Sequence, residues 1–151
     1  MNAKHLVDSK LQSRLASRAP QACCECGARG PDTCDLTHLS WVCVRCAGLL
    51  REFSFRTKSI RLSRLTREEI SSMETAPYHD ALTEAWLASY PPSARRPRGT
   101  DTDEVLKGFL RSKYVDKKWL DPARMASVTA EARTRAATAP PCMILNTQNN
   151  V

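Results

Sequence analysis

The chain has 151 residues, of which 42% are hydrophobic and 26% charged, and its net charge is +7. These values fit one folded domain that is large enough for its own core. No apolar run approaches the roughly 20 residues of a membrane-spanning helix, and the N-terminus has no apolar signal stretch. A reducing cytoplasm is therefore the expected location despite seven cysteines. The positive charge favours an anionic partner without choosing among a membrane surface, an acidic protein face and nucleic acid.

Residues 1–19 place Leu6, Leu11 and Leu15 among lysines and arginines. This pattern predicts an N-terminal basic helical arm that ends near Pro20. We expect a short packing arm, with a helix that touches a membrane surface as the alternative.

Four cysteines form two short pairs, Cys23-x2-Cys26 and Cys43-x2-Cys46, with sixteen residues between the pairs. Each pair offers two sulfur atoms from one tight turn, so the two pairs complete a tetrahedron around one ion. The spacing predicts one structural zinc ion held by Cys23, Cys26, Cys43 and Cys46. Four thiolates leave no position for a water molecule, so this ion would stabilise the fold and do no chemistry itself.

Three other residues near the finger could compete as ligands. Cys24 forms a poorer hook with Cys26, because only one residue separates them. Cys34 is expected to be an ordinary thiol inside the loop, and His38 a packing or surface imidazole.

The remaining elements are short. Trp41–Cys43 reads as a strand that enters the second cysteine pair, and residues 47–52 as one or two helical turns. Residues 59–62 alternate polar and apolar side chains, which predicts a half-buried strand. Turn residues and helical periodicity then predict mostly helix up to residue 137. The first of these helices covers residues 66–74 and starts with a capping box of Thr66 and Glu69. A second helical segment runs from Pro77 to before Pro91, a third contains residues 105–114, and the last starts at Asp121-Pro122. Residues 138–151 lack periodicity and are predicted to be disordered.

Basic residues are concentrated just after the finger, and Glu52 is the only acidic residue across residues 43–67. Such a basic stripe suits an acidic protein face, lipid headgroups or a nucleic-acid backbone. Its members are Arg45, Arg51, Arg56, Lys58, Arg61, Arg64 and Arg67.

The finger continues directly into Cys46-Ala47-Gly48-Leu49-Leu50-Arg51, and then into Arg56-Thr57-Lys58-Ser59. This string resembles the zinc finger of the Arf GTPase-activating (ArfGAP) family. The resemblance covers about residues 20–135. It is closest to the branch that carries FG repeats, because Gly30-Pro31, Lys58-Ser59-Ile60, Lys113-Tyr114 and Lys117-Lys118-Trp119 match that branch in style.

The resemblance implies an α+β fold, in which a short β-sheet around the metal is wrapped by several α-helices. It implies three parts: a helical arm over residues 1–19, an ArfGAP-like zinc domain over 20–137 and a tail over 138–151. The implied function is activation of an Arf-family small GTPase, and Arg51 stands where the family places its catalytic arginine. The anion-binding residues would be Arg45, Arg56, Lys58, Arg61 and Arg64. A monomer is expected, cytoplasmic or peripheral to membranes, and nucleic acid is not the expected partner.

Two alternatives stay open. Thr33 stands where the family usually has a tryptophan, and only residues 52–55 separate Arg51 from Arg56, a shorter connection than is typical. These departures favour a non-catalytic adaptor with the same fold that acts in trafficking or protein contacts. The other alternative is a DNA-binding finger of the GATA kind, which has similar cysteine pairs. The long helical region after the finger argues against it.

Overall fold

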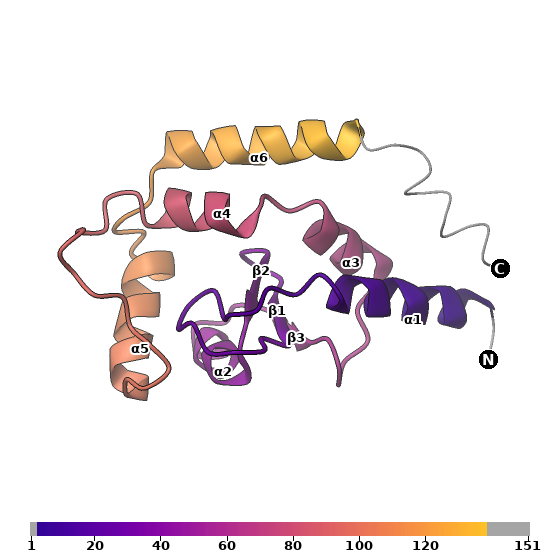
Figure 1. Cartoon of the computed structure of the whole chain (residues 1–151), viewed down its shortest axis with the longest axis horizontal. Coiled ribbons are helices and arrows are strands. Elements are labelled where there is room, and N and C mark those ends of the chain that lie inside the picture. Colours follow the sequence, from indigo (N-terminus) through magenta and orange to yellow (C-terminus); the bar gives the residue numbers. More distant parts are fainter. Residues whose placement is uncertain (1–2, 139–151) are drawn as a thin grey trace.

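The computed structural model describes residues 3–138, and it confirms the expected α+β architecture (Figure 1). A small sheet and one helix lie at the centre, and the other helices surround them. No helix among these residues has the length and apolar character needed to cross a bilayer. Most of the predicted tail, residues 139–151, lies outside the described residues. The elements are, in order, α1 (Ala3–Ala16), β1 (Thr33–Asp35), β2 (Ser40–Val42), α2 (Val44–Glu52), β3 (Thr57–Ser59), α3 (Arg67–Glu74), α4 (His79–Trp86), α5 (Asp103–Leu110), the π-helix η1 (Arg111–Val115) and α6 (Pro122–Ala137).

The sheet has the order β2-β1-β3, and both pairs are antiparallel. Cys34, at the middle of β1, pairs with Trp41 on one side and with Lys58 on the other. The predicted strand before the second cysteine pair is thus confirmed as β2. The helix predicted at residues 47–52 is also present, but it starts earlier, at Val44, directly after Cys43.

The strand predicted at residues 59–62 is wrong. β3 ends at Ser59, and residues 60–63 form a turn instead. The Ser59 hydroxyl accepts hydrogen bonds from the backbone N–H groups of Arg61 and Leu62, so it closes a turn that a strand would need open. The alternation was misleading because Leu62 does not pack on the core and is 91% exposed.

The two helix starts that were predicted from capping residues are confirmed. Thr66 and Glu69 form the predicted capping box at the start of α3. The Asp121 carboxylate accepts from the N–H groups of Ala123 and Arg124 and so begins α6. The long helix over residues 105–114 differs from expectation, because the α-helix ends at Leu110 and continues as one π-helical turn.

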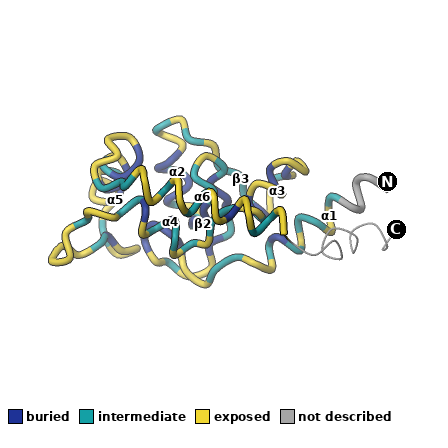
Figure 2. Tube along the Cα trace, turned by 90° about the horizontal axis from the view of Figure 1, so that it is seen from above, coloured by how far each residue is buried: buried dark blue, intermediate teal, exposed yellow. Residues whose placement is uncertain are grey.

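Two hydrophobic clusters hold the elements together. One surrounds the cysteine pairs and includes Leu50 of α2 and Leu110 of α5, and the other joins α1 to α3 through Leu15 and Ile70. The Gln12 side chain also donates to the carbonyls of Ile60 and Ser63. The C-terminal half of α1 is therefore packed against the domain. Helix α6 covers α4 from outside and buries only Ala132, so its trace in Figure 2 is mostly exposed or half-buried.

A buried ion pair connects the finger to the helical layer. Glu25, between the two cysteines of the first pair, is 1% exposed, and its carboxylate accepts from Lys113 Nζ at 2.8 Å and from the Tyr114 hydroxyl. In an α-helix the side chains of consecutive residues point about 100° apart around the axis. Lys113 and Tyr114 are consecutive, but they lie in the π-helical turn η1, and both reach the same carboxylate. Burial by itself would raise the pKa of Glu25, but Lys113 and Tyr114 hold that pKa below its usual value.

We predict that Lys113→Met destabilises the domain by about 3–5 kcal/mol at neutral pH, because it leaves a buried carboxylate without its counter-charge. Urea unfolding of the zinc-loaded chain measures this. The double variant Glu25→Gln/Lys113→Met should recover part of the loss, since it removes both charges. Lys107→Met is the matched control: it removes a half-exposed lysine of α5 that pairs with Glu52 at 3.4 Å, and because such surface pairs contribute little it should stay within about 0.5 kcal/mol of the parent. Equal effects of the two lysine substitutions would contradict the role of the ion pair.

Candidate metal centre and arginine site

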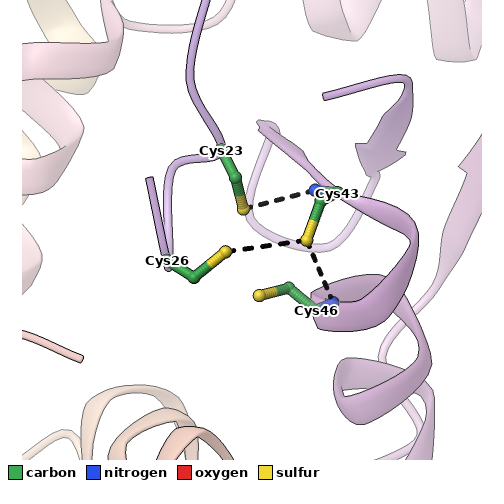
Figure 3. A group of neighbouring side chains, drawn as sticks. All are labelled: Cys23, Cys26, Cys43 and Cys46. Carbon is green, nitrogen blue, oxygen red and sulfur yellow. Dashed lines mark hydrogen bonds between the residues drawn. The ribbon is translucent and has the colours of Figure 1, made fainter. Parts of the chain in front are cut away.

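The four predicted ligands converge on one point (Figure 3). All four Sγ atoms of Cys23, Cys26, Cys43 and Cys46 lie within 4.8 Å of one another, and those of Cys26 and Cys43 are 3.7 Å apart. Zinc–sulfur bonds of about 2.3 Å in a tetrahedron require sulfur atoms about 3.8 Å apart. The observed spacing therefore fits a tetrahedral four-thiolate site.

Local hydrogen bonds orient these sulfurs. The N–H of Cys43 donates to Cys23 Sγ at 3.2 Å, and the N–H of Cys46 donates to Cys43 Sγ at 3.4 Å (Figure 3). Cys43 is thereby also the N-cap of α2. Four sulfur atoms within 4.8 Å of one another cannot all carry a negative charge without a cation, and hydrogen bonding among the thiols accordingly raises the pKa of both Cys23 and Cys46. A divalent ion removes that conflict.

The three rejected ligand candidates lie elsewhere. Burial raises the pKa of both Cys24 and Cys34 to about 12, so these thiols stay protonated, and Cys34 is fully buried under the second cluster. His38 donates or accepts at 2.7 Å with Asp35 and stacks on Tyr114 at 3.8 Å between ring centroids. It packs the core, as expected.

Helix α2 carries Arg51 away from the cysteine cage. Its buried face consists of Cys46, Ala47, Leu49 and Leu50, so the helix is fixed on the cage at one end and on the core along its length. Arg51, in the last turn, is exposed. Five residues after Cys46, it lies about 7.5 Å further along the helix axis. Its Nη1 donates to Thr57 Oγ1 of β3 at 2.9 Å.

Comparison with known proteins now identifies the fold family. Residues 8–123 match the family model described as "Putative GTPase activating protein for Arf". The chain belongs to the ArfGAP family. The match covers the cysteine cage, α2 with Arg51, and the helices up to the start of α6.

Individual relatives agree with this family. The chain is 32% identical over 135 residues to mouse stromal membrane-associated protein 1, covering 87% of this chain and 29% of the relative. It is 33% identical over 111 residues to human Arf-GAP domain and FG repeat-containing protein 1, covering 72% of this chain and 19% of that protein. This ArfGAP chain therefore spans less than a third of either relative's length.

Solved structures show the same fold. The ArfGap domain of HIV-1 Rev binding protein superposes with a TM-score of 0.70 at 27% identity, covering 83% of this chain and 98% of that one. The ArfGap domain of human RIP gives a TM-score of 0.67 at 29% identity, covering 78% of this chain and 90% of that one. The family assignment argues against the GATA-like alternative and leaves the adaptor alternative open.

Several members of the predicted basic stripe form ion pairs with acidic residues that lie outside residues 43–67. Arg45 binds Asp103 at 2.6 Å and the carbonyls of Gly99 and Asp101, so it fastens the start of α2 to the loop before α5. Arg56 and Lys58 both bind the carboxylate of Glu69, at 2.7 and 2.8 Å. Neither partner lies within residues 43–67: Glu69 stands just after that stretch, and Asp103 is 58 residues from Arg45.

Arg61 and Arg64 lie in and beside the turn around Leu62, and both are exposed. The structure therefore does not bring all the predicted anion-binding residues together. Their role in partner binding stays a prediction.

We expect the parent chain to hold one zinc ion, and Cys43→Ser to lose both the metal and cooperative thermal melting, because binding by such a cage is part of the folding free energy. Metal analysis by mass spectrometry and circular-dichroism melting measure these two properties. Cys24→Ala is the matched control: it removes a buried thiol next to Cys23 and should keep one zinc ion per chain. Full zinc content in Cys43→Ser would refute the ligand assignment.

Proposed function

We propose that this chain is a GTPase-activating domain for an Arf-family small GTPase, stabilised by one zinc ion, and that Arg51 is its arginine finger. The observation that carries the proposal is the position of Arg51: an exposed guanidinium on a short helix that is anchored by the cysteine cage. The family match and the GTPase-activating descriptions support it.

The chemistry asks for a group of this kind. Hydrolysis of GTP builds negative charge on the oxygens around the γ-phosphate in the transition state, and an arginine supplied in trans stabilises that charge. A guanidinium stays protonated and presents two parallel N–H donors to phosphate oxygens. The cage would hold the helix in place, and Arg51 would make the only contact with the reacting atoms.

Two neighbours shape the approach to Arg51. Gly48 lies one turn earlier on the same helix face, and a Cβ there would be 3.8 Å from Arg51 Nη2. That distance is an ordinary van der Waals contact, so an alanine methyl group would fit beside the guanidinium. The bond to Thr57 restrains the side chain in the free protein and would be exchanged for phosphate oxygens.

We predict that Arg51→Lys keeps the zinc content, melting temperature and GTPase affinity of the parent but lowers the hydrolysis rate by about 10³–10⁵-fold. Lysine retains the charge and loses the planar pair of donors. Single-turnover GTP hydrolysis with a panel of purified Arf proteins is the measurement.

Arg124→Lys, the same exchange on exposed α6, is the control and should hydrolyse GTP like the parent. If the parent binds a GTPase without accelerating hydrolysis, or if Arg51→Lys is as fast as the parent, the adaptor function replaces this one. The short connection between Arg51 and Arg56 is the feature that favours that outcome.

We further propose that the turn over residues 60–63 contacts an acidic face of the GTPase. Leu62 projects into solvent, with Arg61 directly before it and Arg64 two residues after it. A protruding apolar side chain between basic ones suits a surface with a small hydrophobic patch and an acidic rim.

The double variant Arg61→Glu/Arg64→Glu should raise KM for the GTPase about tenfold or more at low salt and leave kcat little changed, because it acts on encounter and binding. The difference should shrink as ionic strength rises. Arg124→Glu/Arg133→Glu makes the same change in net charge on exposed α6 and is the control. An equal rise in KM for both pairs would show a net-charge effect. Loss of vesicle binding with unchanged KM would assign the turn to a membrane.

A further inference from the structure

A hollow of about 800 Å³ lies away from the cysteine cage, where the C-terminal end of α1, strand β2, the α3–α4 connection and the last turns of α6 meet. In Figure 1 this is the region where the C-terminal half of α6 passes above α3 and α1. Small-molecule sites usually have volumes of roughly 300–1,000 Å³. The hollow is therefore large enough for a ligand, and neither the metal cage nor Arg51 lines it.

The inner wall is apolar. Leu15, Met73 and Leu82 line it and are buried, and Trp41 contributes a half-buried indole. Ala132 of α6 closes one side with its small side chain. Such a wall suits a hydrocarbon chain.

Two of the residues that line the hollow carry a buried polar atom without a hydrogen-bond partner in the region that the structure describes. Ser40 Oγ and Glu74 Oε1 are two of the four buried side-chain polar atoms that make no hydrogen bond within the described part of the chain. Both residues line the hollow, and Ser40 is only 5% exposed. Buried hydroxyl and carboxylate oxygens are nearly always paired in native structures. Both oxygens are closed off from solvent, so each side chain would turn toward the hollow to meet a ligand hydroxyl, which would then donate to Glu74 and bond to Ser40.

The rim is positively charged. Arg18 is exposed at the end of α1, and Arg135 of α6 stacks over the Tyr78 ring at 3.8 Å. Arg135 Nη2 also donates to the Ala76 carbonyl at 2.9 Å, which fixes the guanidinium at the edge of the hollow. Arginines in such positions favour phosphate or carboxylate groups.

We propose that this hollow binds a single-chain anionic amphiphile with a free hydroxyl, in the manner of a lysophospholipid. The hydrocarbon chain would cover the Leu15–Trp41–Leu82 wall, the hydroxyl would pair with Ser40 and Glu74, and the phosphate would meet Arg18 and Arg135. Each part of the ligand would therefore contact a different group of residues in the hollow. This binding does not depend on GTPase activation.

The test is calorimetry of the zinc-loaded full chain with lauroyl lysophosphatidic acid, kept below the concentration at which it forms micelles. Saturable one-to-one binding is expected. Uncharged lauroyl glycerol and the headgroup alone, glycerol 3-phosphate, should each bind about tenfold or more weakly, because each lacks part of the contacts. Equal affinity for the uncharged amphiphile would overturn the proposal.

Three variants locate the site. Arg18→Gln/Arg135→Gln should weaken binding about tenfold or more, while Arg124→Gln/Arg133→Gln, also on exposed surface, should not. Ser40→Ala should raise the melting temperature of the free protein, since it removes an unpaired hydroxyl, and lower the affinity. Unchanged affinity in the Arg18/Arg135 variant would overturn the proposal.

Two further measurements separate competing sources and occupants. Binding to phosphatidic acid vesicles without binding to the monomeric amphiphile would assign the charge to a membrane surface and overturn the pocket. Binding by a chain cut after residue 138, but not by the full chain, would show that residues 139–151 block the hollow and would likewise overturn it.

Discussion

The buried carboxylate of Glu25 joins the cysteine finger to the helices that follow it in the chain. It lies between Cys23 and Cys26, yet its charge is balanced by Lys113, 88 residues later in the sequence. A buried ion pair is weak evidence for net stability, but breaking it by removing one partner is expensive. The pair therefore specifies how η1 docks on the finger more than it strengthens the fold. The π-helical turn is the local distortion that brings Lys113 and Tyr114 to the same carboxylate.

Helix α2 fixes the position of Arg51 relative to the cysteine cage, and the proposed function depends on that position. It begins at a ligand, Cys43, contains a second ligand, Cys46, and ends one residue after Arg51. A nine-residue helix is marginal in isolation, so its geometry depends on the cage and on Leu50 in the core. Under the proposed function, loss of the metal ion would for this reason also release Arg51 from its position. Arg45 holds the start of α2 at a third point through its ion pair with Asp103, so this arginine has a structural role in addition to its charge.

The sequence was most informative where spacing alone defines geometry. The cysteine pairs, the Thr66 capping box and the Asp121 cap each need only residues a few positions apart, and each was predicted correctly. The family string after Cys46 was equally clear. By contrast, the turn after Ser59 mimicked a strand because two-residue alternation over four positions is too short to exclude a turn.

Contacts between distant residues could not be read from the sequence. Glu69 neutralises part of the basic stripe, and Glu25 requires Lys113, but neither pairing leaves a local pattern. The same holds for the hollow, whose lining comes from α1, β2, α3 and α6. Strand β2 lies close to both regions: Ser40 and Trp41 are among the residues that line the hollow, and Cys43 of the cysteine cage follows two residues after Trp41. A short sheet thus separates two chemically different sites by a few residues. The cage is closed by four sulfurs, whereas two residues that line the hollow, Ser40 and Glu74, keep a buried oxygen that has no hydrogen-bond partner among residues 3–138.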